Sequence, residues 1–126
     1  MPHSKTLVIQ SFRTVDVPEW ISACLASVKT WVDMRGYGYR FVGDEIFDRV
    51  PSWYLEKASK HPQIATDLGR LELIHEALNE GYSRVAWLDA DVLIFDPDGF
   101  DVKHIHDFAF GLEFWVQSDQ RGQLKL

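Results

Sequence analysis

Two carboxylates, those of Asp89 and Asp91, stand one residue apart directly after the apolar run 84–88. Like charges this close together cost free energy unless a cation or hydrogen-bond donors meet them. Carboxylate oxygens suit a hard divalent ion such as Mg²⁺ or Mn²⁺, which can be shared with the phosphates of a ligand. The pair therefore predicts a metal-assisted phosphate site. The alternative is that Asp89 caps a local turn and Asp91 is simply solvated.

The elements that must hold this pair follow from the spacing of apolar residues. Short apolar runs over residues 6–11, 37–42 and 84–88 predict buried strands. Apolar positions three and four residues apart predict a helix over 16–36 and another over 66–80. Strand, helix, strand, helix, strand is the order of βαβ units, so we expect an α/β fold with a mainly parallel sheet flanked by helices.

The first helix is expected to begin at a capping box, with Asp16 as the cap and Glu19 three residues later. Gly36 is the expected stop. The buried face of this helix would hold Trp20, Ile21, Cys24, Leu25, Val28, Trp31 and Val32.

The second helix is expected to begin at Thr66 and Asp67. Its predicted buried face consists of Leu68, Leu71, Ile74, Ala77 and Leu78. A short helix over 53–55 and a last strand over 108–114 complete the expected elements.

Ligands of open parallel sheets bind at the carboxyl ends of the strands. Polar groups follow three of the predicted strands, and they are Ser11-Phe12-Arg13, Gly43-Asp44-Glu45 and Asp89-Ala90-Asp91. We expect a binding site where these three segments meet.

The stretch 84–95, Arg-Val-Ala-Trp-Leu-Asp-Ala-Asp-Val-Leu-Ile-Phe, resembles the donor-binding half of GT-A type glycosyltransferases. In that family a strand ends in an Asp-X-Asp motif, and the preceding helix carries a basic residue that faces the sugar nucleotide. The likeness covers about residues 6–114 and is most specific between 66 and 95. It implies a Rossmann-like nucleotide-binding half, with residues 1–126 as a single domain. Such a domain binds a nucleotide-diphosphate sugar with Mn²⁺ or Mg²⁺ and transfers the sugar to an acceptor, here unknown.

The resemblance also implies roles for particular residues. Asp91 would coordinate the metal that bridges the donor diphosphate, and Asp89 would contact the ribose and the metal shell. Ala90 lies between them in the donor-binding motif. Arg70, on the preceding helix, would meet the phosphates or the donor sugar, or is a solvated charge on the helix surface.

At the other two strand ends the implied contacts are with the nucleoside. Ser11, Phe12 and Arg13 would flank the base and ribose, and Phe12 would either stack on the base or pack against the protein. Asp44 would recognise the base edge, or is an ordinary turn aspartate.

The chain departs from the family in length, because complete GT-A enzymes continue well past the motif with strands that build the acceptor site. We therefore interpret the chain as a truncated half, or one completed by another chain, and assign no catalytic base. His104 and His106 alternate as on a strand but follow the motif too soon to match the family's late metal ligand, so we interpret them as strand-edge residues. His75 is expected at a helix surface.

Two other functions compete with a transferase. A phosphatase of the haloacid dehalogenase type would use Asp89 and Asp91 as nucleophile and acid/base, with Lys103 and Ser118 as its downstream candidates. A non-catalytic binding module would instead cover an unpaired sheet edge by self-association as a homo-oligomer. Its interface aromatics would come from Trp53, Tyr54, Phe108, Phe110, Phe114 and Trp115.

Composition excludes several classes. The chain has 126 residues, 46% of them hydrophobic, and 13 Lys+Arg against 19 Asp+Glu give a net charge of −6. This balance favours a soluble globular domain and gives no electrostatic footprint for nucleic acid or for an anionic membrane surface. With one cysteine, Cys24, and no signal peptide or membrane span in the sequence, we expect a cytoplasmic protein.

Overall fold

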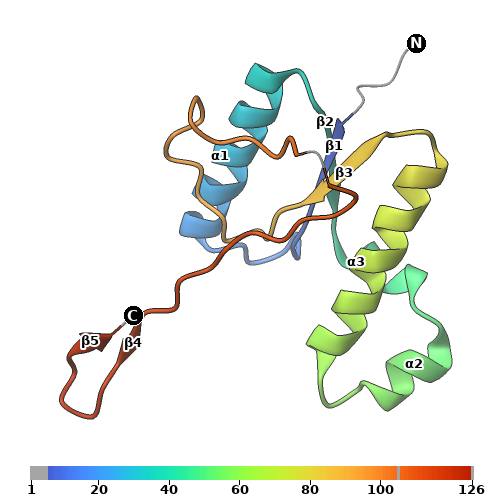
Figure 1. The fold of residues 1–126 in the computed structure, drawn as a ribbon. Coiled ribbons are helices and arrows are strands. Elements are labelled where there is room, and N and C mark those ends of the chain that lie inside the picture. The colour runs from blue at the N-terminus through green and yellow to red at the C-terminus, as the bar shows by residue number, and fades with distance from the viewer. Residues whose placement is uncertain (1–5, 105, 126) are drawn as a thin grey trace.

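The computed structural model describes residues 6–104 and 106–125 and contains a parallel three-stranded sheet (Figure 1). The strands are β1 (Thr6–Ser11), β2 (Gly38–Val42) and β3 (Arg84–Trp87), in the order β2-β1-β3. The register pairs Ile9 with Arg40 on one side and with Trp87 on the other. The α/β class and the three strands predicted from the apolar runs are confirmed.

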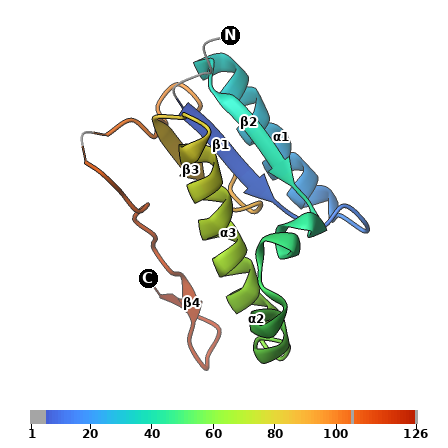
Figure 2. The same cartoon turned by 90° about the vertical axis from the view of Figure 1, so that its right-hand side faces the viewer.

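Helices cover the two faces of the sheet (Figure 2). The helix α1 (Glu19–Arg35) joins β1 to β2 on one face, and α3 (Pro62–Asn79) precedes β3 on the other. Because parallel crossovers are right-handed and β2 and β3 flank β1 on opposite sides, the two helices must lie on opposite faces. A 3₁₀ helix, η1 (Asp44–Arg49), and the short helix α2 (Ser52–Lys57) fill the connection from β2 to α3.

The central strand β1 divides the core into two layers, because its side chains alternate between the faces. Leu7 and Ile9 pack with Leu73 and Ala77 of α3. Val8 packs with buried residues of α1, namely Val28, Trp31 and Val32. Cys24 is also buried on α1, as predicted. None of the helices in the described ranges is long and apolar enough to cross a membrane.

The helix α1 begins differently from the prediction. Its N-cap is Pro18, and no side chain caps the helix, so the proposed capping box of Asp16 is wrong. Asp16 instead adopts a left-handed conformation with φ of 52°, in a loop whose carbonyls accept hydrogen bonds from Arg13. Trp20, predicted to be buried, is 61% exposed because it lies at the margin of the buried face of α1 that Ile21, Cys24 and Val28 form. The stop at Gly36 is confirmed, with φ of 70°.

The helix α3 begins at Pro62, four residues before the predicted start, because proline fits the first turn of a helix. Its buried residues are spaced by four: Ala65, Gly69, Leu73 and Ala77. Leu71 and Leu78, predicted on the buried face, are exposed. Small residues at positions 65, 69 and 77 bring the helix close to its neighbours, which apolar spacing alone does not reveal.

At Gly69 the helix α3 lies close against Ile46 of η1. A Cβ at this position would lie 2.8 Å from Cγ1 of Ile46 and 3.0 Å from its carbonyl oxygen. We expect Gly69→Ala to lower the free energy of unfolding by about 1–2 kcal/mol, because overpacking outweighs the higher helix propensity of alanine. Urea unfolding measures this difference. Ser22→Ala, on the exposed face of α1, is the control, and a Gly69→Ala protein as stable as this control would contradict the packing described.

The segment 89–102 docks on α1 after leaving the sheet. Its partly or fully buried residues Ile94 and Phe100 pack against the cluster around Trp31. The indole Nε1 of Trp31 donates to the carbonyl of Phe100 at 2.9 Å, and Ser27 Oγ accepts from the amide of Ile94 at 3.0 Å. Arg35 donates to the carbonyls of three residues, Pro97, Asp98 and Phe100. Backbone groups of this loop are thus held by side chains of one helix.

Tyr37 and Asp101 close the end of the docked segment, with the phenol donating to Oδ1 of Asp101 at 2.6 Å. Burial and this hydrogen bond raise the pKa of Tyr37. Burial alone would raise the pKa of Asp101, but hydrogen bonds from Tyr37 and the Val102 amide, with the charges of Arg35 and Lys103, hold it below its usual value.

A carboxyl whose pKa is lower in the folded state stabilises the protein above its unfolded pKa, and this contribution is lost as the pH falls through the folded pKa. We therefore expect Asp101→Asn to be less stable than the wild type at neutral pH, and the gap to close below about pH 4. Urea unfolding at pH 7 and at pH 3 measures this difference in the free energy of unfolding. The control is Asp33→Asn, which should not differ from the wild type in this way. A gap of equal size at pH 3 and pH 7 would show that the charge is not responsible.

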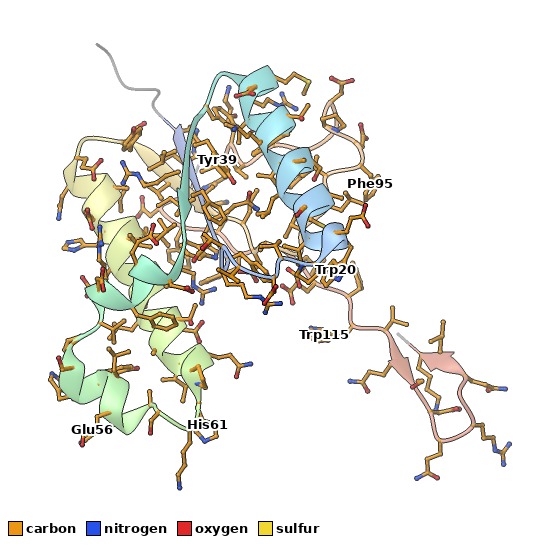
Figure 3. All side chains as sticks on the ribbon, turned by 180° about the vertical axis from the view of Figure 1, so that it is seen from behind. Trp20, Tyr39, Glu56, His61, Phe95 and Trp115 are labelled. Atoms are coloured by element: carbon orange, nitrogen blue, oxygen red, sulfur yellow. The ribbon has the colours of Figure 1, made fainter. Side chains whose placement is uncertain are left out.

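The last part of the chain forms no strand over 108–114, so that prediction is wrong for the described structure. The segment is extended and exposed, and it leads to a hairpin of β4 (Gln117–Ser118) and β5 (Leu124–Lys125) that extends away from the sheet (Figure 1). Alternating apolar residues predict a strand, but a strand forms only where a neighbouring strand supplies hydrogen bonds. Trp115 lies in the stretch that leads to this hairpin, away from the sheet and its helices (Figure 3).

Candidate functional site

The carboxyl ends of the three parallel strands lie at one edge of the sheet, as their common direction requires. The connection after β1 leads to β2 on one side of the central strand, and the next connection leads to β3 on its other side. In sheets with such a reversal, ligands bind at the carboxyl ends of the two strands where it occurs, here β1 and β3. The segments 11–13 and 89–91 lie at the carboxyl ends of these two strands. Asp44, at the end of β2, lies on the other side of β1.

The acidic pair sits on a turn that directly continues β3. The amide of Leu88 donates to the carbonyl of Ile9 at 3.2 Å, which extends the β1–β3 ladder past Trp87. The amide of Val92 then donates to the carbonyl of Asp89 at 3.1 Å and closes the turn. Ala90 points inward and is buried, while Asp89 and Asp91 are exposed. The turn therefore presents both carboxylates to solvent.

Arg70 of α3 reaches the acidic turn. Its Nη1 lies 4.0 Å from Oδ1 of Asp89, and its Nη2 lies 3.1 Å from Oδ1 of Asp67. The guanidinium stands over the ring of Trp87, 5.9 Å from its centroid. The indole Nε1 of Trp87 donates to the same oxygen of Asp89 at 2.9 Å. One carboxylate oxygen of Asp89 is thus oriented by Trp87 and Arg70.

Gln10 supports the turn from inside the protein, and sequence reasoning did not single it out. Its side chain is fully buried at the end of β1. The amide Nε2 donates to the carbonyl of Asp89 at 3.3 Å, and Oε1 accepts from the hydroxyl of Tyr39 at 2.9 Å. A buried polar group needs such partners. The signal was available in the sequence, since a glutamine closes an otherwise apolar run.

The segment after β1 is only partly free to meet a ligand. Ser11 and Phe12 are half-buried, and the amide of Phe12 donates to the carbonyl of Val42 at 3.3 Å. Arg13 is exposed, but its guanidinium donates to the carbonyls of Val15 and Asp16 and stands 5.2 Å from the centroid of the Phe12 ring. Arg13 therefore holds its own loop in this structure.

Asp44 is the exposed first residue of η1. Its neighbour Glu45 turns back on the start of this helix, where backbone hydrogen bonds from Glu45 and Gly43 lower the pKa of the Glu45 carboxyl. The structure places Asp44 at the expected strand end but does not bring it beside Asp89.

None of the contacts described above for the acidic turn involves a histidine. The rings of His104 and His106 are stacked, 6.5 Å between centroids, in a segment that forms no strand, so the strand-edge interpretation is wrong. His75 is exposed on α3, as predicted, and its Nε2 lies 3.3 Å from the side-chain nitrogen of Asn79. Among residues 6–104 and 106–125, no three His, Cys, Asp or Glu side chains form a group that alone could hold a metal.

Two surface hollows lie elsewhere on the protein. One lies over α3 and η1 and is lined by Arg49, Glu72, His75, Glu76, Asn79 and Glu80. The other lies between α2 and the start of α3 and is lined by Trp53, Tyr54, Lys57, Ala58 and Ile64. Both are open depressions, and neither is lined by the acidic pair. We place the candidate site at the strand ends, because the two exposed carboxylates follow β3 at the edge of the sheet where ligands of parallel sheets bind.

Comparisons of the chain with protein families, with curated proteins and with solved structures gave no match.

Proposed function

We propose that the chain binds the diphosphate of a nucleotide sugar between β1 and β3, as the donor-binding half of a GT-A type glycosyltransferase. One observation carries the proposal: Arg70 of α3 lies 4.0 Å from Asp89, and Asp91 is exposed on the same turn after β3. A cation and two carboxylates at this place match a diphosphate bound together with a divalent ion.

The donor set fits an ion that is shared with the ligand. Mg²⁺ characteristically uses one or two carboxylates and completes its shell with substrate phosphates and water. Asp91 has no hydrogen bond or ion pair within the described residues, and Asp89 keeps one oxygen outside its contacts with Trp87 and Arg70.

Arg70 is able to exchange partners when a phosphate arrives. Its ion pair with Asp67 is solvent-exposed, with 35% and 62% of the two side chains accessible. Exposed ion pairs of this kind contribute about 0–1 kcal/mol, so a phosphate competes with Asp67 at little cost. The indole of Trp87 beneath the guanidinium limits where the charge can move.

A divalent ion bound at this turn would stabilise the charge that develops on a diphosphate leaving group. The residues of the chain would hold the donor: Asp91 and Asp89 through the ion, Arg70 through the phosphates, and Ser11 and Phe12 beside the nucleoside. The acceptor is not identified, and we assign no catalytic base.

The test is calorimetric titration of UDP, GDP, CDP, TDP and ADP, each with and without Mn²⁺. We expect one nucleotide to bind, and to bind only in the presence of the ion. No binding by any member of the panel would overturn the proposal.

The phosphatase alternative receives less support. Its candidate Ser118 lies on β4, in the hairpin that extends away from the strand ends (Figure 2). Hydrolysis of a generic aryl phosphate with Mg²⁺, lost in Asp89→Asn, would revive this alternative.

A further inference from the structure

The segment 108–116, here called the extended segment, has the pattern of a strand but no partner strand. Apolar residues occupy every second position, at Phe108, Phe110, Leu112, Phe114 and Val116. All five are exposed, and Phe110 is 91% exposed. Within the described chain the segment pairs with no strand. Its backbone and its apolar face thus both remain open to solvent.

The sheet has a matching open edge at β3. This strand pairs with β1 on one side, and no described strand lies on its other side. All four of its residues are only half-buried, whereas residues 6–10 of β1 are buried. Natural edge strands are protected by charges, prolines or bulges, but the part of β3 after Arg84 is the apolar run Val-Ala-Trp. Exposed Leu71 and Leu78 of α3 add further uncovered apolar surface.

We infer that the extended segment of one copy pairs with β3 of a second copy, in a reciprocal dimer. The hydrogen bonds from Trp31 and Arg35 to the Phe100 carbonyl fix the chain just before the segment. From there the chain passes the open β3 side of its own sheet without pairing with it, and continues to the hairpin (Figures 1 and 2). Because the segment pairs with no strand of its own copy, it remains available to the β3 edge of a second copy, and a two-fold exchange covers the β3 edge of both copies at once.

The area involved is sufficient for a stable dimer. Each buried aromatic side chain contributes roughly 150–250 Å². Three phenylalanines from each copy would therefore bury on the order of 1,000 Å² before any aliphatic or backbone contribution, which meets the size of a specific interface. A lipid surface fits less well, because the nearby charges of Asp107 and Glu113 are negative.

The experiment compares molar masses by light scattering across a concentration series of the full chain. We expect the wild type to reach twice the mass of one chain. Phe110→Lys should remain at the mass of one chain, because a charge cannot enter the apolar face. Leu112→Pro should do the same, because proline removes a backbone donor from the paired strand. Circular dichroism establishes that both variants remain folded.

Phe95→Lys is the matched control, since Phe95 is 89% exposed but lies outside the extended segment (Figure 3). It should dimerise like the wild type. A wild type that stays at the mass of one chain would overturn the inference, as would dimers that survive both Phe110→Lys and Leu112→Pro. Loss of the dimer in Phe95→Lys would equally overturn it, because general apolar association would then explain the result.

Discussion

Replacing Asp91 by asparagine is expected to weaken metal-dependent nucleotide binding by at least about 10–100-fold, the range seen when residues supporting a metal site are changed. The side chain is exposed and makes no hydrogen bond or ion pair within the described residues. Its substitution should therefore leave the free energy of unfolding within about 0.5 kcal/mol of wild type. A binding loss without a stability loss identifies a ligand residue.

The control for this variant is Asp98→Asn, which removes the same charge from an exposed position in the same loop. Calorimetry with the nucleotide that binds wild type measures both proteins. An equally reduced affinity of both variants for the nucleotide would show that the net charge, and not the position of Asp91, affects binding. Unchanged binding in Asp91→Asn would remove this residue from the site.

Replacing Trp31 by alanine is expected to lower the free energy of unfolding by about 3–5 kcal/mol. Trp31 is fully buried, and it contacts Tyr37 and Phe100 edge-on or tilted, with ring centroids 5.6 and 5.0 Å away. Its indole also satisfies the carbonyl of Phe100. The melting temperature should fall by roughly 10 °C or more. Because the docked segment 89–102 loses its main anchor, its amides should also exchange faster than those of β1.

Trp20→Ala provides the matched control, since both tryptophans belong to α1 but Trp20 is 61% exposed. It should change the unfolding free energy by no more than about 0.5 kcal/mol. Urea unfolding and hydrogen exchange measure both variants. Similar losses for Trp20→Ala and Trp31→Ala would contradict the assignment of Trp31 to the core.

Local patterns predicted the three strands of the parallel sheet well, but they also predicted a strand over 108–114 that does not form, and they predicted the helix boundaries poorly. Strands β1 and β2 lie within the apolar runs because turn residues and charges bound each run. The start of α3 was missed because Pro62 begins the helix inside a stretch whose irregular pattern favoured a loop. Trp20 and Leu71 were assigned to buried faces because periodicity gives the direction of a side chain and not whether another element covers it.

The candidate site could be predicted only in part. Asp89 and Asp91 were singled out because they directly follow an apolar strand. Arg70 was singled out only through the resemblance to GT-A glycosyltransferases, and the structure brings it to Asp89. Gln10 was missed because its contact with Asp89 joins positions 79 residues apart. The hydrogen bond from Trp87 to Asp89 could not be predicted, because it depends on how the turn after β3 orients the Asp89 side chain.

The measurement that tests the central claim most directly is the location of bound Mn²⁺ by paramagnetic broadening of backbone amide signals. It is made with the nucleotide that binds in calorimetry. We predict that signals of residues 11–13 and 89–92 broaden first, and that signals around His75 on α3 stay sharp. Broadening centred on the hollow lined by Glu72, His75 and Glu76 would contradict the assignment of the site to the strand ends.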